Sequence, residues 1–129
     1  MRKIKIAVAG CLGRMGQEIV KEVIKNKKLI FIGGFEHKSH PNLNKRLDDI
    51  TDIDSNCVVS SAPNKIIKDA NILIDFTSPT SSLKNIKIAA ANNTAVVVGT
   101  TGITDKQKNT IKTYSKKIPI LVSSNMSLG

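Results

Sequence analysis

The amino-acid sequence predicts an α/β domain with a doubly wound, mostly parallel sheet and helices on both faces. Short apolar, β-branched runs alternate with longer segments of helical periodicity along the 129 residues. Small or hydrogen-bonding residues follow each predicted strand, at the edge where a parallel sheet binds its ligands. The chain is long enough to form one such domain with its own core.

Five apolar runs are predicted to be strands: residues 3–9, 29–35, 71–76, 95–99 and 118–124. The run "CVVSS" (57–61) is predicted to add a short strand. Residues 36–56 are polar and have no sustained period, so an irregular excursion is expected there.

Helices are expected over residues 10–25, 62–70, 79–93 and 105–117. The first has an apolar face made of Met15, Ile19, Val20, Val23 and Ile24. The second has room for only one or two turns. Ser78 and Pro79 are typical of an N-cap and a first helical position, and Thr104 with Gln107 has capping-box spacing.

The first predicted strand runs into "GCLGRMG" (10–16), with three glycines at three-residue intervals ahead of a helix. Such a loop lets backbone N–H groups and the helix dipole contact a pyrophosphate. Gly10 would permit the tight turn, Gly13 would leave bare backbone against the phosphates, and Gly16 would let the helix pack onto the sheet. Glu36, at the end of the second strand, is placed to accept hydrogen bonds from adenosine ribose hydroxyls. A Rossmann-like dinucleotide site is therefore favoured over glycines that serve only a sharp turn.

Two side chains of this loop have alternative readings. Arg14 could contact the phosphates or lie solvated on the first helical turn. Cys11 lies near a helix N-terminus, which could lower the pKa of its thiol, but no base stands beside it in sequence. A small residue in a crowded loop is the better interpretation of Cys11. Cys11, Cys57, His37 and His40 lack zinc-ligand spacing, so no metal site is expected.

Composition excludes several classes of partner. The net charge is +10, but the basic residues are mostly lysines spread in ones and twos, and aromatic residues are scarce. We therefore expect no nucleic-acid partner. No apolar run approaches the ~18 residues of a membrane span, and no signal peptide is evident, so no membrane partner and a cytoplasmic location are expected. The two cysteines lie far apart in sequence, and no disulfide is expected.

The later strand exits carry groups that could orient a ligand. Thr77 and Ser78 follow the third main strand, and "GTTG" (99–102) follows the fourth. These hydroxyl and amide groups could contact a nicotinamide ring or a substrate carboxylate. Asn125, after the last strand, offers a donor and an acceptor for the same task.

The motifs "GCLGRMG", Glu36, "IDFTSP", "VVGTTG" and "SSNMSLG" stand in the order and approximate spacing of one known family. They resemble the N-terminal domain of the dihydrodipicolinate (4-hydroxy-tetrahydrodipicolinate) reductases over essentially the whole chain. The resemblance implies an oxidoreductase that uses NADH or NADPH. Its substrate would be a cyclic dicarboxylate on the diaminopimelate route to lysine.

The resemblance also implies roles for individual residues. The pyrophosphate would be bound by Gly10, Cys11, Leu12, Gly13, Arg14 and Met15, and the adenosine ribose by Glu36. Gly99, Thr100 and Thr101 would lie along the nicotinamide. Ser123, Ser124, Asn125 and Met126 would contact its carboxamide and ring. The Phe76 carbonyl and Thr77 would be further neighbours.

One departure from the family limits these expectations. The family's second domain carries a His-His-x-x-Lys motif for proton donation and carboxylate binding, and this motif is absent here. Residues 1–129 are thus expected to be the dinucleotide-binding domain alone, with no catalytic residue and no turnover of its own. The full-length family would form homo-oligomers.

Two alternatives to this function remain at this stage. The chain could be a stand-alone nucleotide-sensing module, or the cofactor domain of an aspartate or homoserine dehydrogenase. "GTTG" and "SSNMS" favour the reductase. Glu36 is expected to tilt cofactor use toward NADH, with NADPH binding improving as His37 becomes protonated below about pH 6.5.

Overall fold

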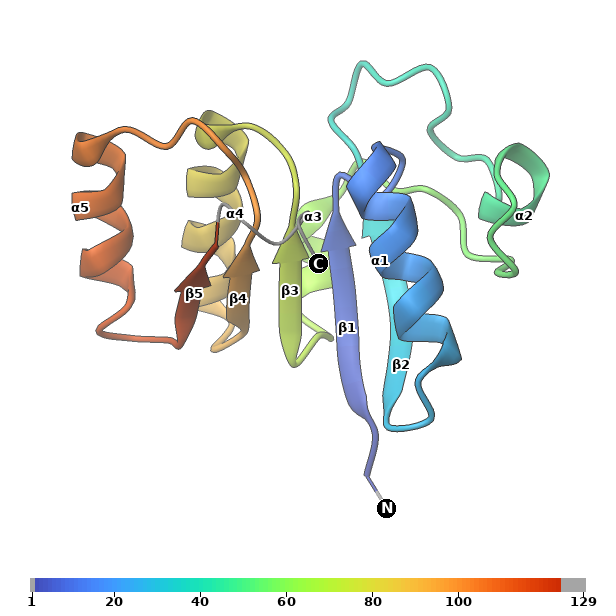
Figure 1. The fold of residues 1–129 in the computed structure, drawn as a ribbon, viewed down its shortest axis with the longest axis horizontal. Helices are drawn as coiled ribbons and strands as arrows, with labels where there is room; N and C mark the ends of the chain where they lie inside the picture. The colour runs from blue at the N-terminus through green and yellow to red at the C-terminus, as the bar shows by residue number, and fades with distance from the viewer. Residues whose placement is uncertain (1, 124–129) are drawn as a thin grey trace.

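A single five-stranded parallel sheet organises the chain. The computed structural model describes residues 2–123. Its strands are β1 (Ile4–Ala9), β2 (Leu29–Phe35), β3 (Ile72–Asp75), β4 (Ala95–Val98) and β5 (Ile120–Val122). The order across the sheet is β2-β1-β3-β4-β5, and every neighbouring pair is parallel (Figure 1). The chain adds β2 on one side of β1 and all later strands on the other, so the strand order reverses between β1 and β3.

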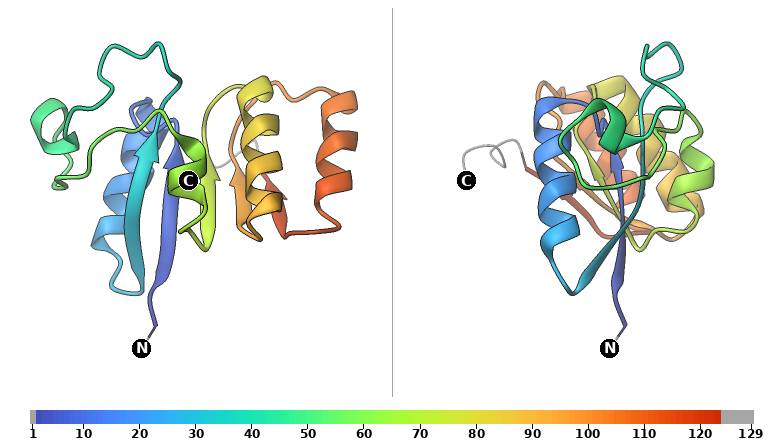
Figure 2. Two further views of the ribbon diagram at one scale, coloured as in Figure 1. Left: turned by 180° about the vertical axis from the view of Figure 1, so that it is seen from behind. Right: turned by 90° about the vertical axis from the view of Figure 1, so that its right-hand side faces the viewer.

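Helices cover both faces of the sheet, as the sequence predicts. They are α1 (Arg14–Lys25), α2 (Leu47–Ile50), α3 (Pro63–Ile67), α4 (Pro79–Ala91) and α5 (Asp105–Tyr114). The right-hand view of Figure 2 shows α1 on one face of the sheet and α3, α4 and α5 on the other. None of the helices in residues 2–123 has the length and apolarity needed to cross a bilayer.

Two separate cores follow from the alternation of side chains along the strands. Ile6 and Val8 of β1 pack with Val20 and Val23 of α1 in one cluster. The neighbouring β1 residues point the other way and join the second core, which contains the buried apolar residues of α3, α4 and α5. The sheet is therefore buried from two sides at β1, the strand that leads into the glycine loop.

Most element boundaries differ from the sequence predictions by one to four residues. The first helix begins at Arg14, not at residue 10, because Gly10 turns the chain at a φ of +77° and Gly13 is the extended N-cap. The last helix ends at Tyr114, three residues short of the prediction. The run 57–61 forms only isolated bridges, from Ser60 to β2 and from Val58 to the excursion.

Within residues 36–56 the structure adds one feature that the sequence did not predict, the single turn α2. Leu47 of this turn is 1% exposed and closes the α1-side core. Ile24 was predicted to share the apolar face of the first helix, but it is exposed. The helix is therefore buried along a narrower face than the sequence indicates, because its buried residues are Gly16, Val20 and Val23, with Ile19 partly buried against the same core.

The capping box of α5 gives a direct stability test. The Thr104 hydroxyl accepts a hydrogen bond from Gln107 N–H, and Gln107 Oε1 accepts one from Thr104 N–H. Thr104→Ala removes one of these bonds, and we expect the free energy of unfolding to fall by about 1 kcal/mol. Thr110→Ala, in the middle of the same exposed helix, should change it by less than ~0.5 kcal/mol because alanine favours helix. Urea unfolding followed by circular dichroism would measure both values, and equal losses would contradict the capping role.

Candidate functional site

The loops that follow β1, β2, β3 and β4 meet at one edge of the sheet. In Figure 1 this is the upper edge, toward which all the strand arrows point. Parallel strands place their carboxyl ends together, so residues far apart in sequence become neighbours here. The described residues of this edge are mostly small or polar, as the sequence predicts.

Close backbone packing shapes the glycine loop. A Cβ atom at Gly16 would overlap the carbonyl oxygen of Gly10, and a Cβ at Gly10 would overlap the carbonyl oxygen of Phe76. Gly10 N–H donates to the carbonyl of Phe35, at the end of β2. The predicted role of Gly10 in the turn agrees with its φ of +77°. Gly16 was predicted to let the helix pack onto the sheet, and its close contacts are with the loop backbone of Gly10 and Cys11.

Gly13 has a different environment. It is exposed, its φ and ψ of −69° and 166° suit any residue, and an added Cβ would have only the Gly10 carbonyl oxygen nearby, at 3.4 Å. The absence of a side chain at Gly13 therefore serves neither the turn nor the packing. What it leaves is bare backbone facing outward at the N-terminus of α1, a 12-residue helix.

Glu36 lies against the glycine loop. Its Oε2 atom accepts a hydrogen bond of 2.8 Å from Leu12 N–H, although 24 residues separate the two. The contact forms because β1 and β2 are adjacent in the sheet and end at the same level. The carboxylate is thus fixed beside the loop by one oxygen.

Two clefts flank the loop. The larger cleft, of about 590 Å³, lies on the β2 side, and the smaller cleft, of about 230 Å³, lies toward β4. The residues that line the larger cleft include Gly13, Glu36, His37, Thr77, Lys84 and Asn85. Those that line the smaller cleft are Gly13, Arg14, Phe76, Thr77, Thr100 and Thr101. Gly13, Phe76 and Thr77 belong to both, so the clefts adjoin across the glycine loop.

A buried carboxylate lies behind this edge, at the end of β3. Asp75 is fully buried and accepts hydrogen bonds from Thr77 N–H at 3.0 Å and from the Thr77 hydroxyl at 2.6 Å. The Ser82 hydroxyl and the Asn85 side-chain amide also donate to it, at 3.1 and 2.9 Å. Thr100 joins the network through Ser82, at 2.7 Å. Asp75 therefore links the loop after β3 to α4 and to the loop after β4.

Cys11 is a packing residue of the loop. Its side chain is fully buried against Gly34, and burial, with the negative charge of Glu36 as a smaller cause, raises the pKa of its thiol to about 12. The possibility that the helix N-terminus lowers this pKa is wrong, because loss of solvent outweighs the dipole. The interpretation of Cys11 as a small residue in a crowded loop agrees with its place.

Most of the predicted binding residues come together, but not all. The predicted residues that line one or both clefts are Gly10, Leu12, Gly13, Arg14, Met15, Glu36, Gly99, Thr100 and Thr101. Cys11 is buried and lines neither cleft. Ser123 instead continues β5, since its N–H donates to the carbonyl of Val98, and it lines neither cleft. Ser124, Asn125 and Met126 lie outside the described residues.

Sequence reasoning missed several residues of this edge. His40, Lys84 and Asn85 line the larger cleft, and Asp75 lies beneath the loops. An aspartate inside the apolar run "NILIDF" is itself a signal, because a charged residue in a buried strand needs dedicated partners. His40, Lys84 and Asn85 carry no such signal, since their spacing in sequence does not indicate which cleft they reach.

Among residues 2–123 there is no group of three or more histidine, cysteine, aspartate or glutamate side chains able to hold a metal ion. In the smaller cleft, Arg14 is the one ionisable side chain among the described lining residues. It is exposed, in keeping with the solvated alternative considered for it. This cleft can therefore hold and orient a ligand through backbone and hydroxyl groups.

Comparison with solved structures supports the fold assignment. A dihydrodipicolinate reductase from Paenisporosarcina sp. TG-14, with dipicolinate bound, superposes with a TM-score of 0.77 at 25% identity, over 98% of this chain and 49% of that chain. A homoserine dehydrogenase from S. aureus gives a TM-score of 0.74 at 14% identity, over 95% of this chain and 33% of that one. The strand order and the glycine loop define a Rossmann-type dinucleotide-binding domain of the kind found in dehydrogenases.

The sequence comparison is more specific. A family model described as "Dihydrodipicolinate reductase, N-terminus" matches residues 4–126, and the chain belongs to this family. A 4-hydroxy-tetrahydrodipicolinate reductase from Pelagibacter ubique (strain HTCC1062) is 40% identical over 129 residues, which are 100% of this chain and 46% of the relative. The same enzyme from Buchnera aphidicola subsp. Baizongia pistaciae (strain Bp) is 35% identical, over 98% of this chain and 47% of the relative. The chain spans just under half the length of these relatives.

The different burial of the two cysteines can be tested by thiol labelling. Cys11 is buried with its pKa raised to about 12, whereas Cys57 is partly exposed. At pH 8 the Cys11 thiol stays protonated as well as inaccessible, and only the thiolate reacts. We expect the native protein to react with an aromatic disulfide reagent at Cys57 alone, and at both cysteines once it is unfolded in guanidinium.

The Cys57→Ser variant isolates Cys11. Its native-state labelling should be at least ~100-fold slower than that of the Cys11→Ser variant, because burial and protonation both protect the remaining thiol. Comparable labelling rates for the two single-cysteine variants would contradict the buried position of Cys11.

Proposed function

We propose that residues 1–129 form the dinucleotide-binding domain of a 4-hydroxy-tetrahydrodipicolinate reductase and bind NADH or NADPH at the glycine loop. The observation that carries this proposal is the outward-facing backbone of Gly13, which lies between two adjoining clefts at the N-terminus of α1. Backbone N–H groups there suit a pyrophosphate. The names of the relatives support the assignment of the activity.

The extended dinucleotide would cross the loop from one cleft to the other. Its adenosine half fits the larger cleft, where one Glu36 oxygen is held by Leu12 N–H and the other can accept from ribose hydroxyls. The pyrophosphate would lie over Gly13. The nicotinamide half would enter the smaller cleft, beside Thr100 and Thr101.

The bound cofactor would supply a hydride to the substrate. This chain's own residues would position the dinucleotide, with Arg14 the exposed cation at the smaller cleft. None of the described lining residues of that cleft is an acid that could donate the proton that accompanies the hydride. We therefore propose that the dicarboxylate is bound and protonated with residues beyond this domain, and that the 129-residue chain binds cofactor without turnover.

The alternatives are less well supported. The homoserine dehydrogenase likeness, at 14% identity, is a likeness of fold alone. A nucleotide sensor without a reaction would share the glycine loop, but the relatives that match the whole chain are named as reductases.

Gly13 provides the first test. Gly13→Val should abolish NADH binding, measured by the fluorescence of the reduced nicotinamide, because the side chain would occupy the space where phosphate meets backbone. The fold should persist, since the local φ and ψ suit valine and an added Cβ meets only one atom, at 3.4 Å.

Gly13→Ala is the matched control, with a smaller side chain and an intermediate loss expected. Circular dichroism would verify the fold of both variants. Normal NADH binding by Gly13→Val would show that the loop does not bind the pyrophosphate. Reduction of the pathway substrate by the wild-type 129-residue chain would contradict the expected lack of turnover.

Glu36 provides the second test, of cofactor preference. Its carboxylate accepts from the free 2′-hydroxyl of NADH and repels the 2′-phosphate of NADPH. His37 is a weak counterpart, because a neutral imidazole donates a single hydrogen bond, and its Nδ1 atom is engaged locally, 2.7 Å from the Ser39 hydroxyl and accepting from Ser39 N–H at 3.3 Å. We expect the wild-type chain to bind both cofactors at pH 8, with NADH favoured.

Glu36→Gln removes the charge but keeps an oxygen that can accept from Leu12 N–H. It should tighten NADPH binding about tenfold relative to NADH, the size expected when one repulsive charge contact is lost. Glu36→Ala also removes the hydrogen bond to Leu12 N–H, and it should weaken NADH binding more than Glu36→Gln does. Much tighter binding of NADPH than of NADH by the wild-type chain at pH 8 would contradict this role of Glu36.

A further inference from the structure

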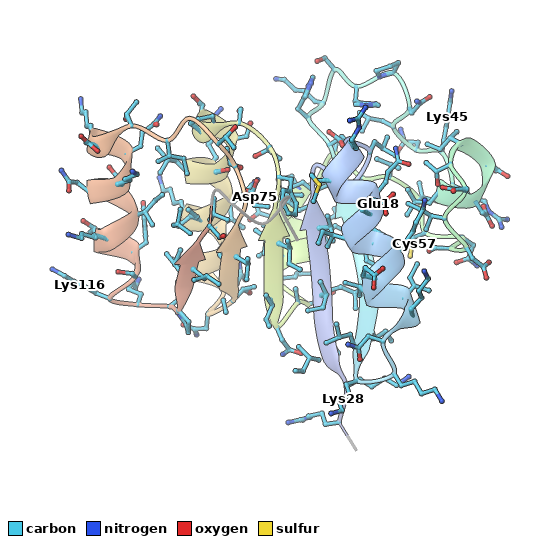
Figure 3. The ribbon with its side chains drawn as sticks, viewed as in Figure 1. Glu18, Lys28, Lys45, Cys57, Asp75 and Lys116 are labelled. Atoms are coloured by element: carbon cyan, nitrogen blue, oxygen red, sulfur yellow. The ribbon has the colours of Figure 1, made fainter. Side chains whose placement is uncertain are left out.

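Asp75 is a buried carboxylate that makes no hydrogen bond to the glycine loop, so binding of a pyrophosphate by that loop does not explain why it is there. Figure 3 shows it at the end of β3, whereas the labelled Lys28, Lys45 and Lys116 lie at the periphery of the molecule. Its partners are the hydroxyls and amides of the loops after β3 and β4 and of α4. Two of these loop residues, Thr77 and Thr100, line the smaller cleft. Asp75 therefore lies one side chain beneath the wall of that cleft.

The hydrogen bonds around Asp75 fit a negative charge. Thr77 N–H donates to Oδ1 and the Asn85 amide donates to Oδ2, so both oxygens act as acceptors, as in an ionised carboxylate. No lysine, arginine or histidine within residues 2–123 forms an ion pair with it. The uncharged N–H and hydroxyl donors stabilise the negative charge of Asp75 but do not neutralise it. Because the carboxylate is buried, solvent and salt screen its electric field only weakly.

We propose that Asp75 favours the oxidised, positively charged nicotinamide ring over the neutral reduced ring in the smaller cleft, and acts as a positioning residue through Thr77 and Thr100. The proposal rests on the proposed function, which puts the nicotinamide there. When the reduced ring transfers a hydride, it loses a proton and two electrons to the substrate carbon and becomes a cation. A buried negative charge nearby stabilises that cation and makes hydride donation more favourable.

Arg14 is the charged side chain among the described lining residues of the smaller cleft, and its positive charge acts in the sense opposite to that of the buried Asp75. It is exposed, so solvent and salt screen its charge more than that of Asp75. It is also unchanged in every variant below. A difference between variants therefore does not come from the charge of Arg14.

The test compares three nucleotides on the 129-residue chain at fixed salt and pH: NAD+, NADH and ADP-ribose, which has no nicotinamide. Asp75→Asn keeps the size of the side chain and removes the charge, and Asn85 can rotate its amide to keep the hydrogen bond. We expect Asp75→Asn to weaken NAD+ binding about tenfold relative to NADH, and to leave ADP-ribose binding within about twofold. Titration calorimetry gives all three affinities.

An exchange variant separates the charge from the structure. Asp75→Asn combined with Asn85→Asp returns one carboxylate to the same buried network, at the other end of a 2.9 Å hydrogen bond. We expect it to recover most of the preference for NAD+. Asp75→Ser, also neutral, should repeat the loss seen with asparagine.

The outcomes are distinguishable. A wild-type chain that binds neither ADP-ribose nor either dinucleotide contradicts the proposed function, and this inference with it. Normal binding of ADP-ribose, with an unchanged ratio of NAD+ to NADH affinity in Asp75→Asn, overturns the role of Asp75 alone. Equal losses for all three nucleotides, or failure of both neutral variants to fold, would assign Asp75 to stability only and also overturn it.

Discussion

The close contact of backbone between the Gly10 turn, α1 and the end of β3 is the constraint on which the rest of the structure depends. Gly16 packs on the carbonyl of Gly10, and Gly10 packs on the carbonyl of Phe76. The Phe76 ring in turn occupies the space beside Gly99. The loops after β1, β3 and β4 are therefore held at van der Waals contact, and Gly13, Phe76 and Thr77 of the first two loops line both clefts.

The distribution of charge is the second organising feature. The chain has a net charge of +10, and its lysines lie mostly on the outside, where solvent screens them. Two carboxylates lie instead at the edge of the sheet that carries the clefts, Glu36 bonded to the glycine loop and Asp75 buried beneath the next two loops. Under the proposed function, the basic surface would attract a phosphorylated ligand, and these two acids would act on the parts of it that are not phosphate.

Local signals predicted the regular elements well. Ser78 caps α4 through Ser81 N–H, and Thr104 caps α5, because capping depends on residues within one helical turn. The same local reasoning placed the first helix start too early, because the turn at Gly10, with its φ of +77°, and the extended N-cap Gly13 separate the strand from the helix. It also missed α2, whose Leu47 is fixed by a distant core and not by a local period.

The sequence by itself determined the α/β class, the glycine loop, the place of Glu36 at the end of the second strand and the resemblance to the reductases, because these depend on residue type and spacing along the chain. Only the tertiary structure decided which side chains meet across loops: Leu12 with Glu36, and Asp75 with Thr77, Ser82 and Asn85. It also decided that Cys11 is buried, with the pKa of its thiol raised, and that Lys84 and His40 line the larger cleft. These contacts depend on the order and register of the parallel strands, because the assembled sheet brings together loops that are far apart in the chain. No periodic pattern of residue types in the sequence marks such contacts.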